Sequence, residues 1–170
     1  MLERLIRFTD RICTGLALLA GVVLILIAAY AVLDALGRKI LSMPLPGAVD
    51  IVSYGLGIAI ALGLPYCTLR LGHVSVPALT DRMQGILRIV PLLGMALSLL
   101  FLAVLAYQVG ITAERRLQTG DEMWMLKVKT WPVWYLIAAM SVFAGFCQLL
   151  LILATCIGLP APERGSQNYE

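Results

Sequence analysis

Charged side chains are scarce in this chain. They make up 14% of its 170 residues, whereas a soluble domain carries about 25%, and 61% of the residues are hydrophobic. A soluble fold of this size buries only about 70% of its chain surface, which would leave too much apolar surface in water. The composition therefore argues against a soluble enzyme, a disordered chain and a nucleic-acid-binding module. The net charge of +3 is also too small for a surface that binds the phosphate backbone of a nucleic acid.

Ionisable side chains are absent from four long stretches of the sequence. These stretches contain no Asp, Glu, Lys, Arg or His, and they cover 12–33, 51–69, 89–113 and 130–162. Each is long enough to cross a bilayer, because a spanning helix needs about 20 apolar residues. We expect four spanning helices at about 12–33, 51–69, 89–113 and 131–157. A β-barrel is disfavoured, since segments such as Leu16–Ala29 are apolar on every face instead of alternating.

The connections between these stretches are too short to fold on their own. The sequence therefore predicts an all-α integral membrane four-helix protein with one transmembrane domain, residues 1–158, and a disordered tail, residues 159–170. Apolar and charged residues are interleaved in two flanking segments, 1–11 and 77–90. Each of these segments either lies in the headgroup plane as a short interfacial amphipathic helix or extends the neighbouring span.

Residues that support chemistry inside a membrane or at a catalytic centre are also few. Proton relays and ion pathways use ionisable residues within the spans, so their absence argues against a self-sufficient pump or antiporter. The single histidine, His73, is too little for a bis-histidine haem or a histidine-rich metal site. The four cysteines lie in apolar stretches without a C-x-x-C pair, and we expect them to be buried packing residues. We therefore expect no enzymatic activity, no metal and no cofactor.

Small and aromatic residues are present in patterns that suit helix packing and membrane anchoring. Gly55, Ala59 and Gly63 recur every four residues in the second stretch, which lets another helix approach closely, either in this chain or in a partner. Four aromatic residues surround the start of the fourth stretch, and such rings favour the membrane–water interface: Trp124, Trp131, Trp134 and Tyr135.

The connections next to the second stretch hold the most specific residues. Gly47 follows two prolines in a turn, and Asp50 then places a negative charge where a helix dipole favours it. After the stretch, Arg70 favours the opposite end of the dipole, and Gly72 suits a helix end. His73 follows directly and has the donors to bind loose carbonyl groups.

These residues carry a family resemblance. The chain resembles the small membrane (Q) subunit of tripartite ATP-independent periplasmic (TRAP) transporters, over roughly residues 34–150. The matching elements are an arginine after the first span, a Pro/Gly turn and an acid before the second, an Arg-x-Gly-His-Val-x-Val element after it, and a later glycine followed by a Thr-Trp-Pro-Val-Trp-Tyr entry to the fourth. The residues are Arg38, Pro46, Gly47, Asp50, Arg70, Gly72, His73, Val74, Val76, Gly120 and residues 130–135.

The resemblance implies a scaffold subunit of the bacterial inner membrane with both termini cytoplasmic. Such a subunit binds a large permease subunit, which holds the substrate and sodium sites, and a periplasmic substrate-binding protein docks on the outer face. The basic residues around the first span agree weakly with this orientation, with three before it and two after it. Five further basic residues are candidates for docking the binding protein alongside Arg38, unless they are only solvated: Lys39, Arg115, Arg116, Lys127 and Lys129.

Two other functions remain open at the level of the sequence. A standalone four-helix assembly factor, or a minor subunit of another membrane complex, has the same composition. A small self-contained carrier is the third possibility.

Overall fold

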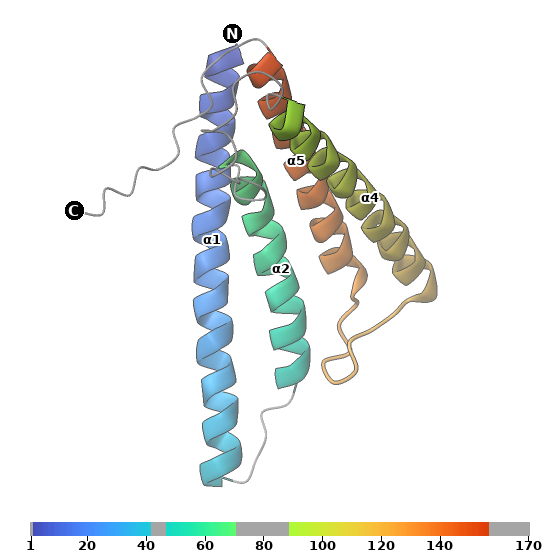
Figure 1. The fold of residues 1–170 in the computed structure, drawn as a ribbon. Helices are drawn as coiled ribbons and strands as arrows, with labels where there is room; N and C mark the ends of the chain where they lie inside the picture. The colour runs from blue at the N-terminus through green and yellow to red at the C-terminus, as the bar shows by residue number, and fades with distance from the viewer. Residues whose placement is uncertain (1, 42–46, 71–88, 157–170) are drawn as a thin grey trace, which may run out of the picture.

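The computed structural model describes residues 2–41, 47–70 and 89–156, and these residues form four long helices (Figure 1). The elements in chain order are α1 (Leu2–Leu36), a short π-helix η1 (Gly37–Leu41) that follows α1 directly, α2 (Ala48–Leu69), α4 (Ile89–Thr119) and α5 (Trp131–Cys156). The all-α fold class is confirmed for the described part of the chain. Four spans in it are long and apolar enough to cross a membrane.

The helices are longer than the uncharged stretches of the sequence. α1 begins at Leu2, so the amphipathic segment 1–11 is helical and continuous with the first span over its described part. α4 continues from the uncharged stretch through Glu114 to Thr119. The second amphipathic segment, 77–90, and the tail, 159–170, lie wholly or almost wholly outside the described residues.

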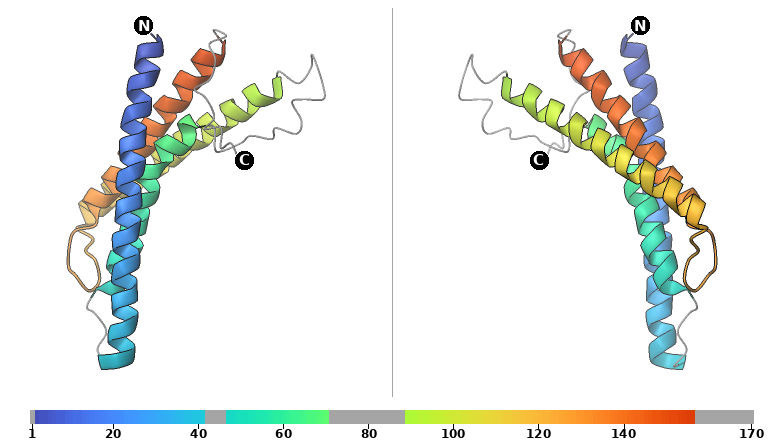
Figure 2. Two further views of the ribbon diagram at one scale, coloured as in Figure 1. Left: turned by 90° about the vertical axis from the view of Figure 1, so that its left-hand side faces the viewer. Right: turned by 90° about the vertical axis from the view of Figure 1, so that its right-hand side faces the viewer.

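The helices form an open layer in the order α1, α2, α5, α4. α2 packs between α1 and α5, and α4 packs along α5 (Figures 1 and 2). α1 and α4 are therefore the outer helices. In each of them, 6% of the most apolar 18-residue segment is buried inside the protein, compared with 28% in α2 and 39% in α5. The outer helices keep most of their apolar surface uncovered by this chain.

The main core cluster lies where α1, α2 and α5 converge, near the N-terminus (Figure 1). Cys13 of α1 and Cys147 of α5 are both fully buried there, with their sulfur atoms 3.8 Å apart. Leu69 and Leu151 complete the cluster. Burial was expected of all four cysteines, but this expectation is wrong for Cys67, which is exposed because no other described helix covers its side of α2. The side chain of Cys156 lies outside the described part.

Two glycines of α2 lie close to the neighbouring helices. A Cβ atom added at Gly55 would lie 2.8 Å from Cδ1 of Ile27 in α1, and one at Gly57 would lie 3.6 Å from Cδ1 of Ile137 in α5. Ala59 is buried, whereas no atom of the described residues lies within 4 Å of a Cβ atom added at Gly63. The small residues thus let α1 and α5 approach α2 from two sides, and the close approach does not extend to Gly63.

Candidate functional site

The ion pairs of the described residues lie at the two ends of the helix layer. The residues between α4 and α5 form a compact hairpin, Gly120–Thr130, which we call the α4–α5 hairpin. Gly120 leaves α4 with a positive φ of 65°, and the two arms meet in a bridge between Glu122 and Lys129. Inside it, the amide of Met123 donates to the carbonyl of Val128 at 2.8 Å. These bonds give the connection a defined shape.

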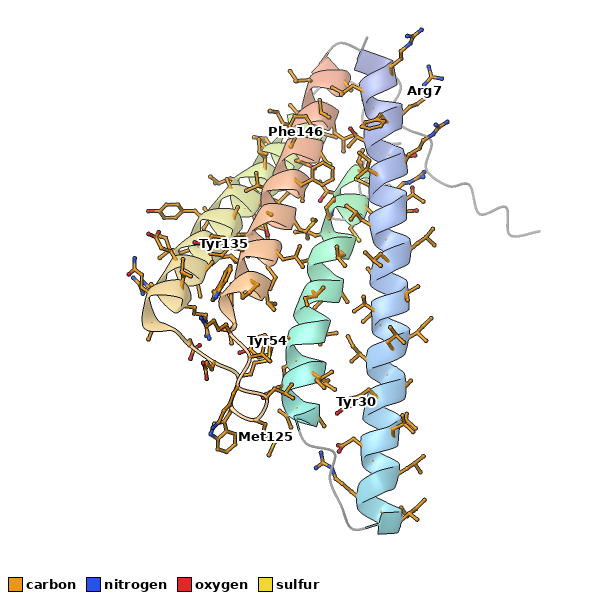
Figure 3. The ribbon with its side chains drawn as sticks, turned by 180° about the vertical axis from the view of Figure 1, so that it is seen from behind. Arg7, Tyr30, Tyr54, Met125, Tyr135 and Phe146 are labelled. Atoms are coloured by element: carbon orange, nitrogen blue, oxygen red, sulfur yellow. The ribbon has the colours of Figure 1, made fainter. Side chains whose placement is uncertain are left out.

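The hairpin docks onto the start of α2. The amide of Met125 donates to Oδ2 of Asp50 at 2.9 Å, and the amide of Gly47 lies 3.3 Å from Sδ of Met125. Gly47 has a φ of 76°, and a Cβ atom there would lie 2.7 Å from Cγ of Leu126. Figure 3 shows Met125 beside the first turns of α2. Gly47 and Asp50, two of the motif residues, therefore share one structural task, which is to seat the hairpin.

Arg116 closes the base of the hairpin. Its guanidinium forms an ion pair with Asp121 and lies 4.8 Å from the ring centre of Trp134. The hydroxyl of Thr130, which is fully buried, donates to the carbonyl of Asp121 at 3.2 Å. Arg116 is thus engaged within the chain, and Trp134 packs beneath it.

Arg38 is also paired within the chain. Its Nε donates to Oδ2 of Asp34 at 2.9 Å across the junction of α1 and η1. Asp34 is only 7% exposed, so Arg38 balances a carboxylate that is nearly buried. The spacing of four residues is the sequence signal for this pair, although the interpretation of the sequence considered Arg38 alone.

Arg70, at the end of α2, joins α2 to α1 at the opposite end of the layer. One Nη atom of Arg70 lies 3.4 Å from Oδ1 of Asp10 in α1, and its guanidinium lies 5.4 Å from the ring centre of Tyr66. The amide of Arg70 donates to the carbonyl of Tyr66 at 3.0 Å and closes α2. The next two motif residues, Gly72 and His73, lie outside the described residues.

Gln148 is a polar residue within a span that the count of ionisable residues missed. It is 4% exposed, and its Nε2 donates to the backbone carbonyl of Met95 in α4 at 3.1 Å. Polar side chains that bond across helices hold membrane helices together. A lone glutamine in an apolar stretch is the signal that would have found it.

Among the described residues, no three His, Cys, Asp or Glu side chains lie close enough together to hold a metal ion. A family model described as "Tripartite ATP-independent periplasmic transporters, DctQ component" matches residues 27–159. The chain belongs to this family. Searches of curated proteins and of solved structures found no match.

Membership confirms the resemblance drawn from the motif residues and makes this DctQ chain a component of a transporter, which is not an enzyme class. The match includes all of α2, α4 and α5 and the last part of α1. The family and the four apolar helices together indicate an integral protein of the inner membrane. The family implies association with a large permease and a binding protein.

Four of the basic residues suggested for docking are exposed and belong to the same end of this DctQ chain: Lys39, Arg115, Lys127 and Lys129. Lys39 is on η1, Arg115 is near the end of α4, and the two lysines are in the α4–α5 hairpin. Figure 1 shows the end of η1 and the hairpin at the end of the layer away from the N-terminus. The fifth residue, Arg116, differs because Asp121 and Trp134 already engage it.

Proposed function

We propose that this chain is the small scaffold subunit that pairs with the large permease subunit of a TRAP transporter. The complex would take up a small organic acid or a similar solute, driven by sodium and supplied by a periplasmic binding protein. The main support is the uncovered apolar surface of the outer helices, which carry no ionisable residue in their membrane stretches. Such helices suit a supporting role beside another membrane protein, while the ion and substrate sites belong to that partner.

The reach of α1 favours a protein partner over lipid alone. α2 has 22 residues, about 33 Å, which matches the hydrocarbon thickness of about 30 Å. The Arg70–Asp10 pair and the Gly55–Ile27 contact place the start of α2 near Asp34. α1 and η1 then continue for seven residues, about 10 Å, and Ile40 in this projection is 73% exposed. An apolar side chain beyond the hydrocarbon level is better covered by protein.

The pairing is tested by co-expressing a tagged chain with a large permease subunit encoded beside it. A stable one-to-one complex in mild detergent is the expected result, and it would also separate this function from a standalone assembly factor. Purification of the chain without the permease would contradict the proposal. Solute uptake by this chain alone in liposomes would contradict it independently and favour a small carrier.

The hairpin end then faces the periplasm, with both termini in the cytoplasm. The exposed residues Lys39, Lys127 and Lys129, together with Arg115, attract an acidic patch of the binding protein, and Arg116 contributes less because it is already paired. Neutralising the three lysines should shift the dependence of transport on binding-protein concentration to higher values. An unchanged curve would reject this docking surface. A cysteine-accessibility assay with Lys127→Cys tests the orientation separately.

A further inference from the structure

The last two turns of α4 form one side of an open hollow. Its lining residues come from α4 and from the first part of the hairpin: Thr112, Arg115, Arg116, Thr119 and Asp121. The uncharged stretch of α4 ends at Ala113, and charged residues begin at Glu114. The hollow therefore lies where the span passes from hydrocarbon to the headgroup layer, which is the level of the lipid phosphates.

Two arginines supply the hydrogen-bond donors of the hollow. Arg116 is held in place by Asp121 and by the ring of Trp134. Arg115 is exposed, and its guanidinium makes no ion pair within the described ranges. The hydroxyls of Thr112 and Thr119 already donate to the carbonyls of Gln108 and Arg115, so they offer only acceptor lone pairs. An anion in the hollow would therefore be held by the guanidinium groups.

The charges of the lining select the ligand. Two guanidinium groups and one carboxylate leave a single positive charge, which the single negative charge of a phosphate diester neutralises. We propose that this hollow binds the phosphate of an anionic phospholipid headgroup, such as that of phosphatidylglycerol. The site rests on the membrane location of α4 and not on pairing with a permease. This proposal assigns Arg115 to a lipid phosphate. It therefore competes with the proposal that Arg115 helps to dock the binding protein.

Trp134 provides a reporter next to the site, because its ring centre lies 4.8 Å from the guanidinium of Arg116, which lines the hollow. The full chain has three tryptophans, so Trp124→Phe with Trp131→Phe leaves Trp134 as the only one. This background is titrated in detergent with short-chain phosphatidylglycerol, with phosphatidylcholine of the same chains, and with inorganic phosphate. The expected result is a saturable change in Trp134 emission with phosphatidylglycerol, at least about tenfold weaker with phosphatidylcholine.

Arg115→Gln should weaken the binding of phosphatidylglycerol by about tenfold, since it removes one charge-assisted contact from an exposed position. Arg11→Gln is the matched control, because it removes the same charge from an exposed arginine at the opposite end of the layer, and it should leave binding unchanged. The proposal would be overturned if Arg115→Gln bound phosphatidylglycerol as tightly as the protein that retains Arg115. It would also be overturned if phosphatidylglycerol and phosphatidylcholine gave equal responses. A response to inorganic phosphate as strong as the response to phosphatidylglycerol would overturn the lipid assignment and indicate a site for free anions.

Discussion

The carboxylate of Asp50 accepts a hydrogen bond of 2.9 Å from the amide of Met125, 75 residues further along the chain. This bond links the first turn of α2 to the tip of the α4–α5 hairpin, although α4 itself packs along α5. The start of α2 and the connection between the last two helices therefore form one unit. A substitution at either residue should be felt at the other.

Asp50→Ala should release the hairpin from α2. The free energy of unfolding should fall by no more than about 3 kcal/mol. The loss is limited because the amide of Met125 is exposed, so water replaces part of the bond. Tryptic cleavage after Lys127, which lies at the tip, should become faster. Asp50→Asn keeps an acceptor oxygen and should show a smaller increase. Equal cleavage rates in all three proteins would show that the bond does not hold the hairpin.

Gly47→Ala should destabilise the protein more than Gly120→Ala. Both glycines have positive φ, 76° and 65°, and a left-handed conformation costs other residues about 1–2 kcal/mol. At Gly47 the new Cβ atom would also press on Leu126, whereas at Gly120 no atom in the described part of the chain lies within 4 Å. The two variants therefore separate backbone strain from the contact with the hairpin. Unfolding by SDS titration measures the difference, and equal losses would remove the contact from the argument.

Gln148→Leu should weaken the pairing of α4 with α5. Hydrogen bonds between membrane helices contribute about 0.6 kcal/mol on average and up to about 1.7, so a loss within this range is expected. Ser141→Ala is the control, because the hydroxyl of Ser141 donates to Ile137 within its own helix. Energy transfer between labels on α4 and α5 measures the helix separation. The prediction would be contradicted if the distance between α4 and α5 were the same in Gln148→Leu as in the unchanged chain.

Oxidation should join α1 to α5 through Cys13 and Cys147. Their sulfur atoms lie 3.8 Å apart, although the residues are 134 positions apart in the chain. A disulfide-forming oxidant such as copper–phenanthroline should yield this bond in a Cys156→Ser background, as peptide mapping would detect. Cys67 is exposed and should instead react first with a maleimide in detergent. A bond between Cys67 and either partner would contradict the exposed position of the Cys67 side chain on α2.

The interpretation of the sequence reached the helices and the family by two independent routes. Long uncharged stretches identify spans because lipid penalises ionised groups, and this holds whatever the neighbours are. The motif residues identified the family, yet their roles depended on contacts that spacing does not reveal. Asp50 was expected to act on a helix dipole, and it also binds the amide of Met125. Arg116 was expected to dock a partner, and it pairs with Asp121.

The sequence by itself determined that four stretches are long and apolar enough to cross a membrane, because the cost of burying charge in hydrocarbon is a local property of each stretch. It also determined where the small residues lie, but not which helix they meet. Tertiary structure decided that Gly55 faces Ile27 of α1 and Gly57 faces Ile137 of α5. It likewise decided that α1 and α4 stay on the outside of the layer. These outcomes depend on the shapes of surfaces far apart in the chain, and nearly uniform apolar stretches do not encode them in any pattern of charge or period.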